Sequence, residues 1–316
     1  MAGVVPGDRA QMAFGYGMFT GGFGLHYGLQ KLGCMMIPAG SGNTERHIAM
    51  IEDYGTTVLA ATPSYALHMC EVGEQMGFDW KASTLRVGLF GGEPCPPGLK
   101  AEIEGRMHIV CTDNYGLTEV MGPGVSGECL AARDMQHIAE DHFLWEVVDP
   151  ETGEPVPDGE MGELVLTPLG KQAIPVLRYR THDLTRVTCE PCACGRTHAR
   201  MRKVRSRSDD MLIIRGTNVF PSQVEDVLAG IEGVAPHYRI VVDTARGLDR
   251  MTVHAELKPE AFSDSFQQME ALRRLVEERL KGVLLVGARV KLVEPGGIER
   301  TTGKARHVED RRKPSA

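Results

Sequence analysis

The sequence predicts an α/β protein with a large domain built on a mainly parallel sheet and a small α+β domain at the C-terminal end. Short apolar runs alternate with helical patterns over the first part of the chain, which favours βαβ units. A charged stretch at 196–208 then separates this region from a compact final segment. The chain has 316 residues, more than one hydrophobic core usually supports. We therefore expect two domains, at 1–208 and 209–316.

The composition is that of a soluble globular protein with neither a nucleic-acid nor a membrane partner. Hydrophobic residues make up 42% and charged residues 24% of the chain, and the net charge of −7 provides no basic footprint for nucleic acid. No apolar run approaches the roughly 18 residues that a membrane helix needs, and the N-terminus does not resemble a signal peptide. We expect a cytoplasmic protein.

Two apolar runs in the large domain each end in a turn, as buried strands do. Residues 57–60 precede Thr62-Pro63-Ser64, and residues 85–90 precede Gly91-Gly92-Glu93-Pro94. Helical patterns separate the runs, around 48–54 and 66–76.

The turns after these strands are the predicted ligand-binding edge of the sheet. In open parallel sheets, ligands bind at the carboxyl ends of the strands. Gly91-Gly92-Glu93-Pro94 and Tyr115-Gly116-Leu117-Thr118-Glu119 both follow apolar runs. We therefore expect both to open onto this edge.

The pattern then changes to short strands with turns at 149–153 and 157–160, which predicts a smaller antiparallel or barrel-like subdomain over 145–169. In the final segment, Ser222-Gln223-Val224-Glu225 is interpreted as a capping box that starts a helix. The remaining expected elements are strands at 238–242 and 251–257, a helix with Phe266, Met269, Leu272, Val276 and Leu280 on one face, and a strand near Val290.

Four short motifs follow one another along the chain, and each is weak by itself. They are Tyr115-Gly116-Leu117-Thr118-Glu119, Arg178-Tyr179-Arg180-Thr181-His182-Asp183, Arg207-Ser208-Asp209-Asp210 with Arg215-Gly216-Thr217-Asn218, and Gly303-Lys304. Taken singly, the first is a strand-ending turn, the second a charged surface strand and the last a solvated tail lysine. In this order, however, they resemble the motifs of the adenylate-forming superfamily.

Within that superfamily the chain resembles the phenylacetate-CoA ligase family. Five further segments carry the resemblance, which spans essentially the whole chain: 14–22, 62–66, 122–125, 192–197 and 218–222. The resemblance implies the adenylate-forming fold, with a large AMP-binding domain and a small mobile C-terminal domain. It also implies an ATP-dependent aryl-acid CoA ligase, which forms an acyl adenylate from the acid and ATP and then passes the acyl group to CoA.

The resemblance assigns the adenylation chemistry to particular residues. Glu119 would bind Mg²⁺, Thr118 would contact a phosphate, and Lys304 would bring its charge to the substrate carboxylate and the α-phosphate. Asp183 would accept hydrogen bonds from the ribose hydroxyls. The other nucleotide-binding residues would be Gly92, Glu93, Pro94, Tyr115 and Arg207.

The thioester step and the acid pocket are also implied by the family. Asp209 matches the hinge about which the small domain turns, and Gly216 would face the CoA tunnel. Ser206 stands where the family commonly has glycine. Tyr16, Phe19, Phe23 and Tyr65 are either an aromatic pocket for the acid or ordinary core aromatics.

Cysteines supply a second candidate site. Eight cysteines are too few for a disulfide scaffold in a chain of this length. Four of them lie singly and are predicted to be buried core thiols: Cys34, Cys70, Cys95 and Cys111. With the resemblance, Cys129, His137, Cys192 and Cys194 form a candidate structural Zn²⁺ site, since thiolates and imidazole suit tetrahedral zinc. Cys189 and His142 are alternative ligands.

One part of the family pattern is absent from the sequence. Family members carry a Ser/Thr/Gly-rich phosphate-binding loop followed by lysine, and residues 1–9 resemble the family just after that loop. The large domain is therefore expected to be N-terminally truncated. Three explanations are open: a misassigned start, a catalytically impaired remnant that retains AMP or CoA binding, or a split enzyme completed by an N-terminal chain. A homodimer is also compatible with the sequence.

Overall fold

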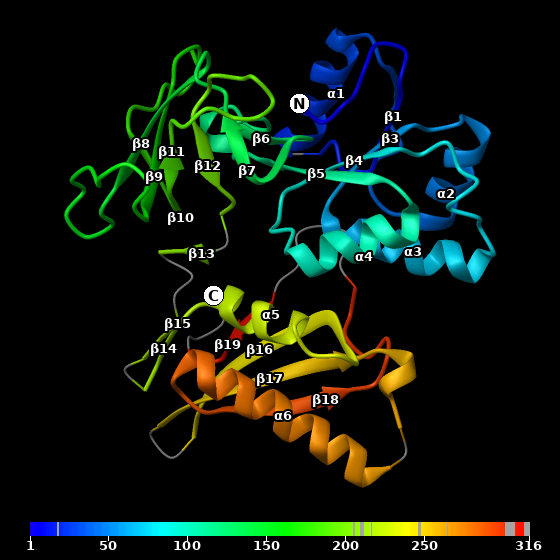
Figure 1. Ribbon diagram of the computed structural model, residues 1–316, viewed down its shortest axis with the longest axis vertical. Coiled ribbons are helices and arrows are strands. Elements are labelled where there is room, and N and C mark those ends of the chain that lie inside the picture. The colour runs from blue at the N-terminus through cyan, green and yellow to red at the C-terminus, as the bar shows by residue number, and fades with distance from the viewer. Residues whose placement is uncertain are drawn as a thin grey trace. The chain divides into compact units, whose positions relative to one another are not determined.

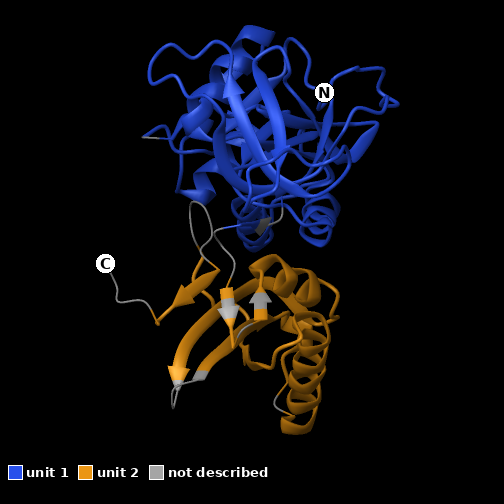
Figure 2. Ribbon diagram, turned by 90° about the vertical axis from the view of Figure 1, so that its left-hand side faces the viewer, with its two compact units in different colours: residues 1–208, 301–304 blue, residues 209–300, 305–316 orange. Residues whose placement is uncertain are grey.

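The structure is a computed structural model of the chain, and it forms two compact units (Figures 1 and 2). It describes residues 1–312 except 18, 205, 209–211, 216, 246–247, 264 and 301–306. The first unit contains residues 1–208 with 301–304, and the second contains residues 209–300 with 305–316. Each unit is described by itself below.

A mixed nine-stranded sheet organises the first unit, in the order β11-β12-β7-β6-β5-β4-β3-β1-β2. Strands β2, β1, β3, β4 and β5 are parallel to one another, which confirms the predicted βαβ arrangement. Their bounds are β1 (Arg9–Met12), β2 (Met35–Ile37), β3 (Val58–Ala61), β4 (Val87–Gly91) and β5 (Val110–Tyr115). The antiparallel extension consists of β6 (Ser126–Cys129), β7 (Ala132–Ile138), β12 (Arg200–Arg202) and β11 (Val187–Thr188).

Helices cover both faces of the parallel strands (Figure 1). Successive residues of β3 alternate between two cores: Leu59 and Ala61 pack with α2 to α4, whereas Val58 and Ala60 pack with α1. This alternation is the period-two pattern of a strand that is buried on both faces. The helices are α1 (Thr20–Leu32), α2 (Thr44–Asp53), α3 (Pro63–Met76) and α4 (Pro97–Met107).

Local sequence signals account for the bounds of α3. The Thr62 side chain accepts a hydrogen bond from the Tyr65 N–H, and Pro63 occupies the first turn, where no backbone donor is needed. Gly77 ends the helix with φ of 74°, a left-handed conformation that glycine adopts without strain. The predicted helices at 48–54 and 66–76 correspond to α2 and α3.

A second, four-stranded antiparallel sheet has the order β13-β10-β9-β8. It confirms the predicted antiparallel subdomain, which extends further along the chain than 145–169. Its strands are β8 (Phe143–Val148), β9 (Gly162–Pro168), β10 (Tyr179–Thr185) and β13 (Ser206–Arg207). Because β10 pairs with β13, Asp183 lies opposite Arg207.

A buried ion-pair cluster joins separate parts of the first unit. The Glu128 side chain on β6 is inaccessible to solvent and contacts the ammonium groups of Lys100 on α4 and Lys203 after β12. The Nζ of Lys100 lies 2.5 Å from Oε2 of Glu128, and the same oxygen accepts the Asp113 N–H at 2.7 Å. Burial raises the pKa of Asp113 to about 7. A fully buried carboxylate depends on such partners, because it has lost its hydration.

The second unit is an α+β fold around a four-stranded sheet in the order β18-β17-β16-β19. The central strands β16 and β17 are antiparallel, and β18 and β19 are parallel to their neighbours. The elements are β14 (Leu212–Ile214), β15 (Thr217–Val219), α5 (Pro221–Ala229), β16 (Val234–Ala245), β17 (Leu248–Leu257), η2 (Pro259–Ala261), α6 (Phe266–Leu284), β18 (Ala288–Val293) and β19 (Val308–Asp310). Val276 and Leu280 of α6 are fully buried in its core and Leu272 packs against it, as the helical pattern predicted. Phe266 was predicted on the same face, but it is the first residue of the helix and is 82% exposed.

The capping box predicted at 222–225 is wrong. Helix α5 begins at Pro221, so Ser222 lies inside its first turn and Phe220 precedes it. The Gln223 side chain accepts the Phe220 N–H at 2.9 Å. Proline at the first helical position moves the start upstream, because it has no N–H to satisfy and its fixed φ suits the helix.

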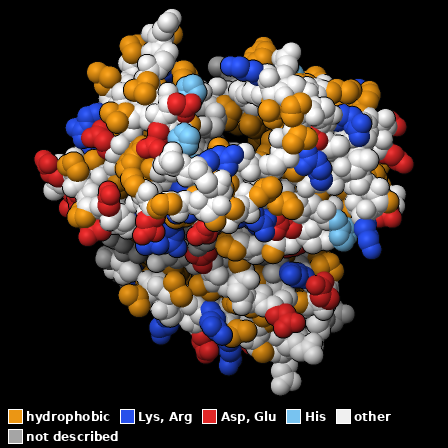
Figure 3. Space-filling view, turned by 45° about the horizontal axis from the view of Figure 1, so that its top comes forward, with side chains coloured by type: hydrophobic (Ala, Val, Ile, Leu, Met, Phe, Trp, Pro, Cys, Tyr) orange, Lys and Arg blue, Asp and Glu red, His pale blue; other side chains and the backbone are white. Residues whose placement is uncertain are grey.

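The molecular surface mixes charged and apolar side chains. On the face drawn in Figure 3, side chains of both charge signs alternate with hydrophobic ones. Among the residues that the structure describes, no helix combines the length and the apolar character needed to cross a membrane.

Replacing Lys100 should destabilise the first unit strongly. In a Lys100→Met variant the buried Glu128 keeps only one ammonium partner, and we expect a loss of about 3–5 kcal/mol in the free energy of unfolding. Urea titration followed by circular dichroism measures it. Lys81→Met, at an exposed site, is the matched control and should change stability by less than about 0.5 kcal/mol. Equal stability of both variants would show that the cluster adds little.

Candidate functional site

Loops from three parallel strands meet at one edge of the main sheet. Thr62 follows β3, Gly92 follows β4, and the Tyr115–Glu119 motif begins at the end of β5. The Oε1 atom of Glu93 accepts the Ser64 N–H at 2.6 Å, which ties the second loop to the start of α3. Gly92 has φ of 85°, where other residues are strained. The loops therefore lie at the carboxyl edge, as the sequence predicts.

Phe19 reaches this edge from the segment before α1. A Cβ atom built on Gly92 would lie 3.6 Å from Cγ2 of Thr62 and 3.9 Å from the Phe19 ring. An aromatic side chain thus lies beside the loop that follows β4.

The Tyr115–Glu119 motif forms a closed turn that ends in the short 3-10 helix η1 (Thr118–Val120). The Gly122 N–H donates to the Leu117 carbonyl at 2.8 Å, and a Cβ on Gly116 would lie 2.8 Å from Cα of Pro123. The Lys171 ammonium donates to the carbonyl of Glu119. The backbone of the turn is therefore held, while the Thr118 and Glu119 side chains remain exposed.

A polar junction connects this turn with the second sheet. The Tyr115 hydroxyl donates to Oδ2 of Asp183 at 2.5 Å, and Arg207 lies 3.4 Å from Oδ1 of the same carboxylate. Burial, reinforced by the Asp183 charge, raises the pKa of Tyr115 well above its usual range, so the phenol stays a donor. Burial and then the charge of Glu119 raise the pKa of Tyr179. The side chains of two separate motifs thus converge.

The four aromatic residues proposed for the acid do not form one cluster. Tyr16 and Phe23 make an edge contact with ring centroids 5.2 Å apart, and Phe19 packs 5.6 Å from Phe14. Phe19 is 38% and Phe23 45% exposed. Tyr65 lies instead in the core of α2 to α4, where its hydroxyl is 3.2 Å from that of Thr44.

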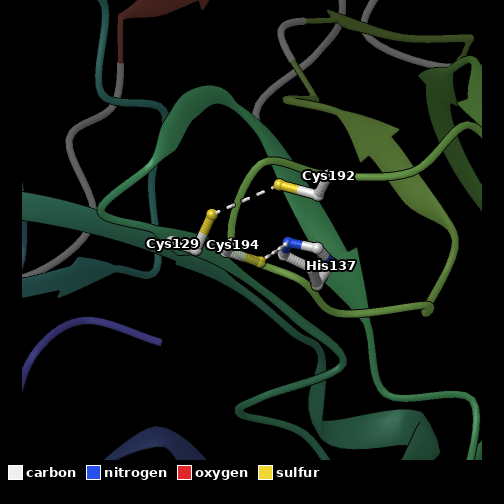
Figure 4. Close-up of side chains that lie close together, drawn as sticks. All are labelled: Cys129, His137, Cys192 and Cys194. Atoms are coloured by element: carbon white, nitrogen blue, oxygen red, sulfur yellow. Dashed lines mark hydrogen bonds between the residues drawn. The ribbon is translucent and has the colours of Figure 1, made fainter.

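Cys129, His137, Cys192 and Cys194 point toward one another (Figure 4). Their donor atoms all lie within 4.8 Å of one another. The sulfurs of Cys129 and Cys192 are 3.7 Å apart, and the Cys194 sulfur lies 3.3 Å from Nε2 of His137. These are the four residues of the predicted metal site. Cys189 and His142 are exposed and lie outside the group.

Strand pairing explains why these four residues meet. Cys129 ends β6 and His137 lies on β7, and the two strands form a hairpin. Arg200 on β12 pairs with His137, which brings the preceding loop with both remaining cysteines beside β7. Gly195 closes that loop by donating its N–H to the Cys192 carbonyl at 2.9 Å.

The pKa values of two cysteines in this cluster shift in opposite directions. The Arg196 backbone N–H lowers the pKa of the Cys194 thiol to about 6, so this sulfur is a thiolate at neutral pH. Burial raises the pKa of Cys129. A bound cation would remove that penalty, because metal ligands are deprotonated cysteines.

Three residues named from the sequence, Lys304, Asp209 and Gly216, lie outside the part of the chain that the structure describes. Arg207 and Ser208 immediately precede Asp209, and Ser208 donates its N–H to the His182 carbonyl at 2.7 Å.

Sequence reasoning missed the contact between Ser64 and Glu93 and the Glu128 cluster. The sequence does contain a signal for the contact between Ser64 and Glu93, because the first turn of α3 has backbone N–H groups that need an acceptor. The Glu128 cluster has no local sequence signal, since Glu128 and Lys100 are 28 residues apart.

Comparison with known proteins places these sites in context. The AMP-binding enzyme family matches residues 6–169, and the AMP-binding enzyme C-terminal domain matches residues 216–312. Phenylacetate-coenzyme A ligase of Aromatoleum evansii is 48% identical over 97% of this chain and 69% of its own length. That of Escherichia coli strain K12 is 45% identical over 98% and 71%. The crystal structure of 2-hydroxyisobutyryl-CoA ligase, in the postadenylation state with 2-HIB-AMP, superimposes with a TM-score of 0.92 at 30% identity, covering 98% of this chain and 67% of that one.

Replacing Tyr115 by phenylalanine should destabilise the junction of the two sheets. The variant loses a hydrogen bond to a carboxylate, so we expect a loss of about 1.5–3 kcal/mol in the free energy of unfolding. Chemical denaturation measures this loss. Tyr54→Phe, at a residue that is 49% exposed, is the matched control and should behave like the unmodified chain. An unchanged Tyr115→Phe variant would mean that the hydroxyl has an equally good alternative in water.

Proposed function

The chain belongs to the phenylacetate-coenzyme A ligase family of AMP-binding enzymes, and from this premise we propose how its residues carry out the reaction. The family performs ATP-dependent CoA ligation through an acyl adenylate, and we propose an aryl acid of the phenylacetate type as the substrate. The observation that carries the proposal is the junction of Tyr115, Asp183 and Arg207 at the end of β5, the strand that pairs with β4 just before Gly92. It offers a hydrogen-bond acceptor in the carboxylate of Asp183 and a cation in Arg207. The loop at Gly92, where no side chain blocks a ligand, lies at the same edge of the parallel sheet.

The nucleotide would bind across this edge. Asp183 would accept hydrogen bonds from the ribose hydroxyls, because Tyr115 and Arg207 orient its carboxylate without burying it completely. Arg207 would also face the ribose or a phosphate. Gly92, Glu93 and Pro94 would pack against the adenine, and the bond from Ser64 to Glu93 holds this loop in shape.

The phosphates would lie at the η1 turn. The Thr118 hydroxyl would donate to a phosphate oxygen, and Glu119 offers the hard oxygen donor that Mg²⁺ prefers. Mg²⁺ held there would neutralise phosphate charge during the displacement of pyrophosphate. In this step an oxygen of the substrate carboxylate attacks the α-phosphorus, and the bond to pyrophosphate breaks. Lys304 would hold the attacking carboxylate and the α-phosphate together as their charges approach.

We propose that the second half-reaction uses the hinge assigned to Asp209. In it the CoA sulfur attacks the acyl carbonyl and AMP leaves with the bonding electrons. Gly216 would face the CoA pantetheine, where the lack of a side chain gives room. Ser208, held to His182, anchors the chain on the large-domain side of the hinge.

We propose that Tyr16, Phe19 and Phe23 line the acid pocket and that Tyr65 supports it from the core. The supporting observation is the position of Phe19 beside Gly92, which brings an aromatic ring next to the nucleotide loop. Edge and stacking contacts of such rings favour an aryl acid over an aliphatic one of equal size.

The cysteine cluster fits a structural zinc ion. In a tetrahedral site with bonds of about 2.3 Å, two sulfurs are about 3.8 Å apart. Cys129 and Cys192 are 3.7 Å apart, and the second pair, Cys194 with His137, contributes a thiolate and an imidazole. Four protein donors fill the coordination sphere, so the ion would stabilise the structure and leave no open position for catalysis.

Replacing Lys304 should abolish adenylation and leave nucleotide binding nearly intact. We expect Lys304→Ala to lower the rate of AMP formation from ATP, Mg²⁺, CoA and phenylacetate by about 100- to 1,000-fold, because a charge that stabilises the transition state is lost. Lys281→Ala, an exposed lysine of α6, is the matched control. AMP affinity, measured by calorimetry, should be the same in all three proteins.

Two outcomes would contradict this proposal. Equal rates for the Lys304→Ala variant and its control would remove Lys304 from the mechanism. A folded chain that binds AMP but forms no acyl adenylate would favour a role in nucleotide binding over self-sufficient ligation.

Metal content tests the zinc site. We expect the unmodified chain to retain a single zinc ion after gel filtration, and Cys192→Ser to lose it together with thermal stability, because one thiolate ligand is missing. Cys189→Ser removes an exposed thiol three positions away and should retain zinc. Mass spectrometry under native conditions measures the bound ion. Zinc in neither the chain nor the control would contradict the site.

A further inference from the structure

The segment that carries Lys304 is anchored on both sides to the sheet of the second unit. Arg300 is the last described residue before it and His307 the first after it. We propose that Glu256, near the end of β17, is the positioning residue of this segment: it anchors Arg300 and thereby delivers Lys304 to the adenylation reaction. The inference rests on the function proposed above for Lys304.

Glu256 receives four hydrogen bonds from the chain just before Lys304. Its carboxylate accepts the Gly296 and Ile298 N–H groups, each at 3.1 Å. Arg300 donates to both oxygens, Nη1 to Oε2 and Nη2 to Oε1, each at 2.7 Å. Such a bidentate pair sets the orientation of both side chains as well as their distance.

Glu256 is a buried charge, and within the described part of the chain its hydrogen-bond partners all lie in residues 296–300. Its side chain is 3% accessible. Burial by itself would raise the pKa of Glu256, but the bonds from Arg300 and the two backbone N–H groups lower it, so the carboxylate is ionised at neutral pH. An ionised, buried carboxylate strongly disfavours any conformation in which the segment leaves it.

A separate anchor holds the other side of the segment. The His307 carbonyl accepts the Ile240 N–H at 2.7 Å, and its ring stacks on Tyr238 with centroids 4.3 Å apart and planes 9° from parallel. The chain then continues as β19, where Val308 pairs with Ile240 of β16.

Lys304 is close in the sequence to both anchors: it follows Arg300 by four positions and precedes His307 by three. Positioning of such a side chain matters for catalysis, because a displacement of about 1 Å can lower a rate on the order of 100-fold.

The test separates positioning from simple stabilisation. Glu256→Gln keeps the shape and one carbonyl acceptor but loses the charge, and Arg300→Lys keeps the charge but loses the bidentate geometry. Glu294→Gln removes an exposed carboxylate close by in the same segment and is the matched control. For each folded variant we would measure kcat and KM for ATP in acyl-adenylate formation, and thioester formation from supplied acyl adenylate.

We expect Glu256→Gln and Arg300→Lys to lower kcat of adenylation on the order of 100-fold. KM for ATP should stay the same, because the nucleotide contacts lie in the first unit, and thioester formation from supplied adenylate should change little. A role in stability alone predicts no change in kcat for the folded fraction. Unchanged kcat in both variants would therefore overturn the inference.

A second measurement does not depend on turnover. Trypsin cleaves after Lys304 and Arg306, and mass spectrometry follows the rate at each bond. We expect cleavage to be at least several-fold faster in Glu256→Gln than in the unmodified chain or Glu294→Gln. Equal cleavage rates would overturn the anchor. If the unmodified chain forms no adenylate but its cleavage rate depends on Glu256, the proposed function fails while the anchor stands.

Discussion

The geometry of the parallel sheet is the constraint on which the rest of the first unit depends. Strands β1, β3, β4 and β5 run in one direction, so the segments that follow them emerge at one edge. Three of these segments carry different chemical groups: an aromatic ring at Phe19 after β1, a glycine at Gly92 after β4 and a carboxylate at Glu119 after β5. Parallel strand pairing thus brings residues that are up to 100 positions apart to the same edge of the sheet, and this placement requires no direct contact between them.

Two polar clusters then fix the second sheet and the strands beyond β5. Tyr115 and Asp183 connect the end of β5 to β10, and Glu128 connects β6 to α4 and to the segment after β12. Glu128 is the neighbour of Cys129, so the cysteine cluster and the ion-pair cluster share strand β6. Buried polar networks of this kind contribute little net energy when satisfied but are costly to break, and they therefore specify one arrangement.

In the second unit, too, a buried polar cluster specifies one arrangement of the chain. Its apolar core holds β16, β17 and α6 together, whereas one buried carboxylate, Glu256, specifies the course of the chain from Gly296 to Arg300. A loop rich in polar residues cannot be held by hydrophobic packing, so a charged anchor takes that role.

The sequence by itself determined the features that depend on local spacing and on neighbouring residues. Alternation and helical periodicity were enough for β3, β4, α2 and α3, and the motif order led to the family and to the four residues of the cysteine cluster. The start of α5 was misplaced because Pro221 competes with Ser222 as a helix-start signal, and local rules do not rank the two. Only the tertiary structure decided that Tyr65 belongs to the core, that Tyr115 donates to Asp183 and that Glu128 and Glu256 are buried. The partners of these side chains are distant in sequence or set by the packing around them, and the cost of an unpaired buried charge exists only once the chain has folded around it.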